Sequence, residues 1–201
     1  NSKKLGHKKF NVSKRVPMGI KVLDRQIEKG FEYSSNNLVV GGSGSGKSIF
    51  AMQFLLEGIR RGENVLYISF EETKEEFFNN MKEIGWNLDK YERSGKLTYL
   101  EYSPEKIKMM LDEGGGDVEG IIIRKKIKRL VIDSLSSFTS LYNDVSSQRQ
   151  GIISLFSIIQ RWDCTSLFTI QNDSAKTKDS SSTQAEIQSD SILLLYFKKV
   201  N

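Results

Sequence analysis

The 201-residue chain has a single cysteine, Cys164, and a single histidine, His7. One cysteine supports neither an intrachain disulfide nor a cysteine zinc site, and one histidine rules out histidine-rich metal sites and histidine-based triads. Long apolar runs are also missing: the longest, ILLLYF at 192–197, is far too short to span a membrane. The first residues, NSKKLGHKKF, lack the apolar stretch of a signal peptide. We therefore expect a cytoplasmic protein with no membrane partner.

Hydrophobic residues make up 38% of the chain and charged residues 27%, which indicates a soluble globular protein with one substantial core. The net charge of +5 comes mainly from a basic N-terminus and from a second basic cluster at 124–129. Basic clusters can mark contact with nucleic acid. We interpret the second one as a solvated helix end before a strand, where cations suit the helix dipole. The expected organisation is a flexible basic tail over 1–14 and a single domain over 15–201.

The most informative stretch is NLVVGGSGSGKS at 37–48, which matches G-x-x-x-x-G-K-S/T. A buried strand precedes the glycines and a helical apolar pattern, IFAMQFLLEGI, follows them, which is the context that this phosphate-binding motif requires. Glycines let backbone N–H groups wrap an anion, and the helix start adds a positive dipole end. The alternative is a glycine turn that binds no anion. The predicted nucleotide-binding residues are Gly41, Gly42, Ser43, Gly44, Ser45, Gly46, Lys47, Ser48 and Ile49.

A phosphate loop of this kind works with Mg²⁺. We expect Lys47 to reach the β- and γ-phosphates and the Ser48 hydroxyl to ligate the metal. In KRLVIDS at 128–134, three apolar residues are followed by Asp133. An aspartate at such a strand end is expected to hold Mg²⁺ through water. The alternative is that Asp133 only caps the end of the strand.

Polar residues end two further predicted strands. Glu71 and Glu72 follow NVLYISF directly, and Gln171 ends TSLFTIQ. The carboxyl ends of parallel strands share one sheet edge, so we expect these residues to face the glycine loop. We predict that at least one of the two glutamates is catalytic and orients the attacking water, although the dipole of the following helix would also favour carboxylates here. We predict that Gln171 contacts the γ-phosphate and passes the signal of hydrolysis to the loop 174–184.

Apolar strands alternate with helices along the chain, which predicts an α/β fold with a mostly parallel sheet covered on both faces. The expected strands are near 37–41, 64–70, 96–102, 129–133, 165–171 and 191–197. The expected helices are near 47–60, 74–84, 104–112, 118–128 and 148–162. Helix starts are indicated by a capping box of Thr73 and Glu76, by Ser103 before a proline, and by a weaker box of Ser147 and Gln150. The polar stretch 174–183 predicts a mobile loop.

These pieces, in this order, resemble the KaiC-like branch of the RecA superfamily of P-loop ATPases, from about Arg15 to Phe197. The resemblance rests on RVPMGIKVLDRQIEKGF before the first core strand, on GGSGSGKS, NVLYISFEE and IGWNLDKYERSGKLTYLEY, and on RLVIDSLSSF. It implies a RecA-like fold, Glu71 and Glu72 as the water-activating pair, and ATP hydrolysis between subunits of a homo-oligomeric ring or filament. The family usually continues with a strand whose Lys and Arg reach the neighbouring site. This sequence ends at Asn201 before such a strand, which leaves two alternatives: a truncated C-terminal end, or a chain without activity across subunits.

The leading hypothesis is an ATPase that binds ATP with Mg²⁺ and hydrolyses it slowly as an oligomer. One alternative is a nucleotide-dependent switch or scaffold with negligible hydrolysis that regulates a protein partner. Another is a DNA-binding recombinase paralogue, supported by the basic tail and the polar loop; at most weak DNA binding is expected. The resemblance adds that RecA-type recombinases touch DNA through the loops after the positions of Asp133 and Gln171. A GTPase is disfavoured, since no Asn/Thr-Lys-x-Asp motif is present.

Overall fold

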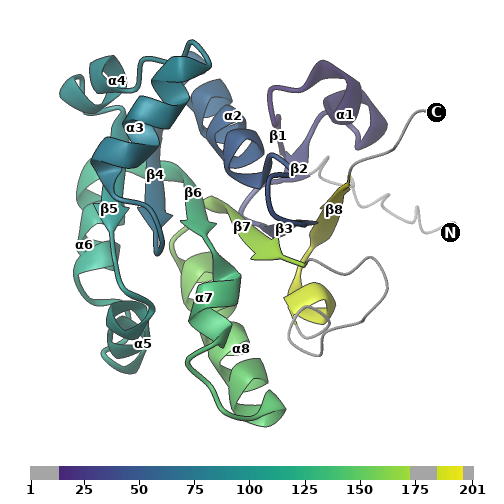
Figure 1. The fold of residues 1–201 in the computed structure, drawn as a ribbon, viewed down its shortest axis with the longest axis vertical. Coiled ribbons are helices and arrows are strands. Elements are labelled where there is room, and N and C mark those ends of the chain that lie inside the picture. The colour runs from purple at the N-terminus through teal and green to yellow at the C-terminus, as the bar shows by residue number, and fades with distance from the viewer. Residues whose placement is uncertain (1–13, 173–184, 197–201) are drawn as a thin grey trace, which may run out of the picture.

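A computed structural model describes residues 14–172 and 185–196. Its main feature is a six-stranded sheet in the order β5-β4-β6-β7-β3-β8, in which every neighbouring pair is parallel. The strands, shown in Figure 1, are β3 (Asn36–Gly41), β4 (Asn64–Ser69), β5 (Leu97–Glu101), β6 (Ile127–Asp133), β7 (Thr165–Gln171) and β8 (Ser191–Leu195). A separate antiparallel pair joins β1 (Arg15–Val16) and β2 (Phe31–Glu32).

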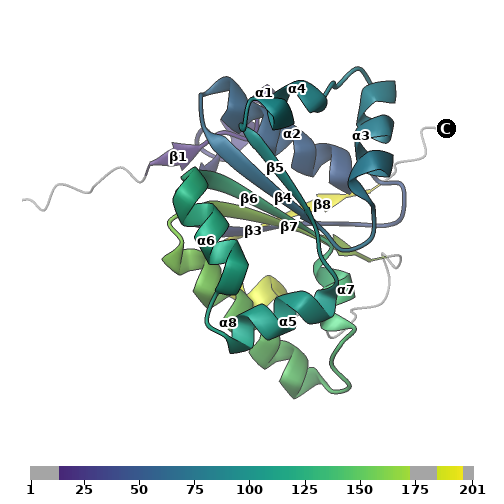
Figure 2. The ribbon, with the colours of Figure 1, turned by 90° about the vertical axis from the view of Figure 1, so that its left-hand side faces the viewer.

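Helices cover both faces of this sheet (Figure 2). One face carries α1 (Lys21–Gln26), α2 (Lys47–Arg60), α3 (Lys74–Glu83) and α4 (Asp89–Arg93), and the other carries α5 (Pro104–Asp112), α6 (Gly116–Lys125), α7 (Leu135–Thr139) and α8 (Val145–Arg161). Successive strand residues point to opposite faces, so Leu38 and Val40 join one core and Val39 joins the other. The predicted doubly covered parallel α/β fold is confirmed.

Helix ends follow the predicted capping signals in two of three cases. Thr73 and Glu76 form both halves of a capping box, and the Ser103 hydroxyl accepts from the N–H of Lys106. The predicted box at Ser147 is wrong. Helix α8 begins earlier, and its cap is Asp144, whose carboxylate accepts from the Ser147 N–H at 2.9 Å. Aspartate is among the strongest N-cap residues because its side chain satisfies an otherwise free backbone donor.

The short elements α1, α4 and α7 and the β1–β2 pair were not predicted, because two to six residues carry too little periodicity to recognise. Helix α6 also ends sooner than expected. Lys126 takes a left-handed conformation with φ of 52°, which stops the helix, and β6 begins at Ile127.

The interpretation of the second basic cluster as a solvated helix end is wrong for Arg129. This residue lies inside β6 and is fully buried. Its Nε donates to Glu63 Oε2 at 2.6 Å, and its Nη1 donates to the carbonyls of Pro17 at 2.5 Å and Phe54 at 2.9 Å. The alternation of the strand explains this, because residue 129 shares the α2-facing side of β6 with the buried Val131. Of the basic residues in this cluster, only those at 124–126 form the exposed end of α6.

Two expectations fall outside the described residues: nearly all of the tail 1–14, and the loop 174–183. Within the described ranges, no helix combines the length and the apolar character that crossing a bilayer would need.

Candidate functional site

The glycine loop connects β3 to α2 as the motif predicts. Gly44 and Gly46 have φ of 71° and 90°, a left-handed conformation that glycine adopts without strain. Gly41 is tightly packed, because a Cβ atom there would lie 2.5 Å from the Leu195 carbonyl oxygen and from Ser45 Oγ. Gly46 is the N-cap of α2 and offers no side-chain acceptor, so the first N–H groups of this helix remain available to an anion.

Two side chains of the loop also suit a phosphate site. Lys47 is half-buried, and its Nζ donates to the Gly42 carbonyl at 2.8 Å, which keeps the cation folded over the loop. Ser45 Oγ is buried and has no hydrogen-bond partner within the described structure. A buried hydroxyl without a partner is costly unless something else satisfies it. The loop therefore fits the oxygen-rich phosphate group that its sequence predicts.

The second part of the site is Asp133, at the carboxyl end of β6. Its Oδ2 accepts from the Ser48 hydroxyl at 2.7 Å and from the Tyr67 hydroxyl at 2.5 Å, and its Oδ1 accepts from the Thr169 hydroxyl. Burial, and next the negative charge of Asp133, raise the pKa of Tyr67 well above its usual value, so this phenol stays protonated and donates. The structure thus joins Ser48 and Asp133, the two residues predicted to hold Mg²⁺.

The donor set is appropriate for this metal. Among the described residues, no group of three or more His, Cys, Asp or Glu could form a protein cage for a metal ion. Magnesium is usually held by one or two carboxylates together with waters and substrate phosphates. A serine hydroxyl and one aspartate beside a phosphate loop match that pattern.

The glutamate pair follows β4, which lies next to β6 in the sheet. Glu71 is exposed, and its Oε1 accepts from the hydroxyls of Ser134 at 2.9 Å and Ser137 at 2.5 Å. Ser134 is the residue directly after Asp133, so this contact draws Glu71 toward the end of β6. The backbone N–H groups of Glu71 and Glu72 also donate to Ser69 Oγ, at 3.4 and 3.0 Å.

Glu72 has a different environment. Its side chain is half-buried, and its Oε1 accepts from Asn80 Nδ2 at 3.4 Å. Burial raises the pKa of Glu72 above its usual value, and the negative charge of Asp133 adds to this shift. Glu72 lies in the segment after β4, and β4 is the neighbour in the sheet of β6, whose carboxyl end carries Asp133.

Gln171 ends β7 and is exposed. In the register of the sheet it is the partner of Gly41, the first glycine of the loop, and its N–H donates to Ser136 Oγ at 2.9 Å. The structure therefore brings the loop, Asp133, the glutamates and Gln171 to one sheet edge. Sequence reasoning missed Tyr67, Thr169, Ser134 and Ser137, although a threonine inside the buried strand TSLFTIQ was a usable signal.

Several known proteins are similar to this chain in sequence. A family model described as "ATPase: KaiC" matches residues 16–201. The chain is 31% identical over 164 residues to the circadian clock protein KaiC3 of Synechocystis, covering 78% of this chain but only 32% of that protein. It is 32% identical over 172 residues to a UPF0273 protein of Thermotoga maritima, covering 79% of this chain and 70% of the relative.

A solved structure is also similar. A crystal structure of a KaiC-like protein from Pyrococcus horikoshii superposes with a TM-score of 0.77 at 26% identity. The match covers 90% of this chain and 80% of the other. This chain and that protein therefore share the same overall fold.

Proposed function

The chain belongs to the KaiC family of ATPases, and on that premise we propose that it binds ATP with Mg²⁺ and slowly hydrolyses the terminal phosphoanhydride bond. The observation that carries this proposal is that Ser48, Asp133 and Glu71 lie together beside the glycine loop. Ser48 donates to Asp133 at 2.7 Å, and Glu71 is bonded at 2.9 Å to Ser134, which follows Asp133 in the chain. We further propose that residues 15–201 form one such domain.

In this proposal the loop residues 41–49 bind the phosphates through backbone N–H groups, and Lys47 leaves the Gly42 carbonyl to pair with a phosphate oxygen. Ser48 and Asp133 hold Mg²⁺, with Tyr67 and Thr169 orienting the aspartate. When bound, Mg²⁺ supplies positive charge that offsets the charge developing on the phosphate oxygens. The protein side chains act mainly by positioning and electrostatics, which is what phosphoryl transfer requires.

We assign the activation of water to the glutamate pair and favour Glu71. Both hydroxyl bonds to Glu71 fall on Oε1, so Oε2 is the atom that we propose to face the water. Glu72 is the second choice, since the raised pKa of its carboxyl brings its basicity nearer to neutral pH, where a general base works best. Gln171 is proposed to contact the γ-phosphate from its place beside Gly41.

The test is ATP turnover by Glu71→Gln and Glu72→Gln, which keep the side-chain shape and remove the charge. We expect turnover to fall at least about tenfold at unchanged ATP affinity, because general bases typically contribute about 10²–10⁴-fold. Glu75→Gln is the matched control, since Glu75 is an exposed glutamate in the first turn of α3. Intact turnover in the double variant of Glu71 and Glu72 would refute the catalytic assignment.

One observation favours a second function, a nucleotide-dependent switch with negligible hydrolysis. Two serine hydroxyls donate to Glu71 Oε1, so one of its two carboxylate oxygens is already engaged and cannot orient a water. If the wild-type protein shows no turnover even as an oligomer, the switch becomes the better description. In that case ATP binding should still alter the binding of a protein partner.

We propose that the protein acts as a homo-oligomer. Among the residues that the structure describes, β8 is the last strand of the sheet, and Ile192 and Leu194 on it are 40% and 64% exposed. Exposed apolar residues on such a strand favour pairing with another chain. Native mass spectrometry tests the proposal, and a monomer at micromolar concentration with ATP would contradict it. The circadian role in the names of some relatives belongs to much longer proteins, such as the one of which this chain spans 32%, and is not extended to this chain.

The recombinase alternative rests on the basic tail and the loop 174–184, of which the structure describes only Lys14. It remains a prediction of weak DNA binding that falls steeply with salt as counterions are released. A fluorescence anisotropy titration with single-stranded DNA at two salt concentrations tests it. No binding at low salt would remove this alternative.

A further inference from the structure

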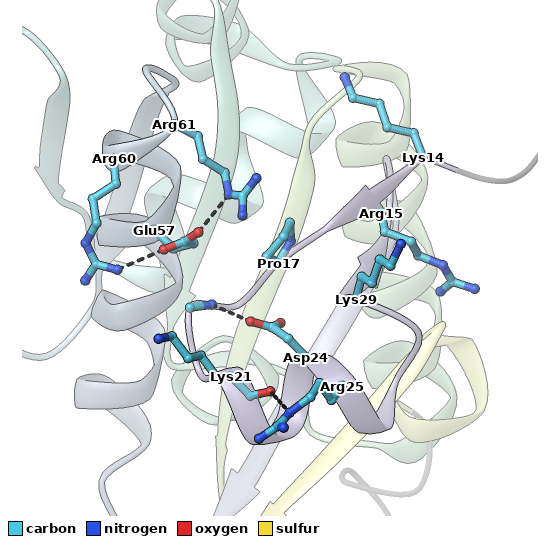
Figure 3. A pocket seen from close by; sticks show the side chains of 11 residues that line it. Lys14, Arg15, Pro17, Lys21, Asp24, Arg25, Lys29, Glu57, Arg60 and Arg61 are labelled. Atoms are coloured by element: carbon cyan, nitrogen blue, oxygen red, sulfur yellow. Dashed lines mark hydrogen bonds and ion pairs between the residues drawn. The ribbon is translucent and has the colours of Figure 1, made fainter.

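A second hollow lies away from the glycine loop, between the α1 segment and the C-terminal end of α2 (Figure 3). Its volume of about 940 Å³ falls in the range of small-molecule sites, about 300–1,000 Å³. The loop lies at the other end of α2, a helix of 14 residues and therefore about 20 Å long. The hollow is thus a separate feature from the proposed nucleotide site.

Positive charge dominates the walls of this hollow. Seven of the residues that line it are cationic, against two carboxylates. The cations come from three segments of the chain, namely β1, the α1 region and the end of α2. They are Lys14, Arg15, Lys21, Arg25, Lys29, Arg60 and Arg61.

The two carboxylates are already engaged. Asp24 accepts from the backbone N–H of Met18 at 2.7 Å and of Gly19 at 3.1 Å, so it serves to fix the turn before α1. Glu57 is shared by Arg60 at 2.8 Å and Arg61 at 2.7 Å. One carboxylate between two guanidinium groups leaves an excess of positive charge on the α2 wall.

On the opposite wall, formed by β1 and the α1 region, fewer of the positive charges are paired with carboxylates. Lys21, Arg25 and Lys29 are exposed and form no ion pair with any residue that the structure describes. Arg15 is the exception on this side, since it pairs with Glu28 at 2.7 Å. In Figure 3 the cationic side chains surround Pro17 and Asp24, which occupy the centre of the view. The charges therefore encircle one hollow instead of following a line.

Hydrogen bonds within the protein fix the floor of the hollow. The buried Arg129 donates to the Pro17 carbonyl at 2.5 Å, and Gln53 Nε2 donates to the Gly19 carbonyl at 3.2 Å. Gly19 has φ of 84°, and a Cβ atom there would lie 2.8 Å from Glu57 Cβ. The α1 segment is thus held tightly against α2, so the backbone that carries the two charged walls is fixed before a ligand binds, which lowers the cost of binding.

We propose that this pocket binds a compact polyanion that carries several phosphate groups. Four of the seven cations are arginines, whose planar forks match phosphate oxygens in a bidentate way. A nucleic-acid strand is the weaker choice. None of the lining residues is aromatic, so the pocket offers no platform for stacking bases.

The experiment is a calorimetric titration with inorganic tripolyphosphate, in Mg²⁺ and a saturating non-hydrolysable ATP analogue that fills the glycine loop. One tripolyphosphate should bind per chain, and Lys47→Ala protein, in which the loop is disabled, should bind it equally well. Lys21→Gln with Arg25→Gln should weaken binding at least about tenfold, since two unpaired cations are lost. The matched control, Lys82→Gln with Arg93→Gln, removes the same charge from exposed residues elsewhere and should change affinity less than about twofold.

A variant of the other wall tests whether both walls form one site. Arg60→Gln with Arg61→Gln should also weaken tripolyphosphate binding about tenfold or more. No binding, or an equal loss in the control variant, would overturn the proposal. Tighter binding of a single-stranded oligonucleotide, lost in the same pocket variants, would overturn it in favour of nucleic acid. Dependence of tripolyphosphate binding on Lys47 alone would assign it to the glycine loop and also overturn it.

Discussion

Replacement of the buried Arg129 should destabilise the protein more than that of any exposed cation. Its guanidinium makes three hydrogen bonds, to the carboxylate of Glu63 and to the carbonyls of Phe54 and Pro17. Arg129→Met keeps much of the side-chain length but leaves all three acceptors without this partner. Removing one member of a buried pair costs about 3–5 kcal/mol.

The partial exposure of Glu63 decides where in that range the value falls. The Glu63 side chain is 29% exposed against 1% for Arg129, so water can recover part of the loss and we expect about 3 kcal/mol. For a domain of this size that lowers Tm by roughly 6–12 °C. Urea titrations followed by circular dichroism give the free energy of unfolding. Arg124→Met, an exposed site on α6, is the control and should stay within about 0.5 kcal/mol. A loss below about 1 kcal/mol for Arg129→Met would refute the reasoning.

Three further predictions concern the proposed nucleotide site. Gly41→Ala places a methyl group 2.5 Å from the Leu195 carbonyl, so ATP affinity by calorimetry should fall at least about tenfold, and an unchanged affinity would contradict the close packing. Tyr67→Phe removes one hydroxyl donor from Asp133 and should lower the free energy of unfolding in urea by about 1.5–3 kcal/mol; equal stability would show that this bond contributes nothing. The raised pKa of Glu72 means that ionisation of this carboxyl opposes folding. Glu72→Gln should therefore increase the free energy of unfolding above about pH 4.5, by less than about 1 kcal/mol after screening, and should leave it unchanged below that pH. A lower free energy of unfolding for Glu72→Gln at pH 7 would contradict this prediction.

The residues at the carboxyl edge of the sheet could be predicted from the sequence. In a parallel sheet all strands end at the same edge, so residues far apart in the chain are placed close together. Ser48 and Asp133 are 85 positions apart and meet at 2.7 Å, as expected when a glycine loop and an apolar strand both end at the carboxyl edge. The hydroxyl partners of Asp133 could not be predicted in this way. Tyr67 and Thr169 reach it because β4 and β7 flank β6, and the order of strands in a sheet is not written in the periodicity of any single strand.

The positions of the positive charges could also be predicted only in part, because clusters along the sequence differ from clusters in the folded structure. Two basic clusters stand out along the chain, yet the second contributes no residue to the walls of the large hollow, and its Arg129 is buried beneath as a structural anchor. The hollow instead gathers cations from three separate segments, among them Arg60 and Arg61 at the end of α2. A count of charges cannot tell a cation that faces water from one held by three acceptors, because one step along a strand moves a side chain to the opposite face. Lys128 pairs with Asp163 at the surface while its neighbour Arg129 is buried. The cations of this chain therefore have two separate physical roles. The buried Arg129 holds the segment before α1 against α2, and the exposed cations give the resulting pocket its positive electrostatic potential.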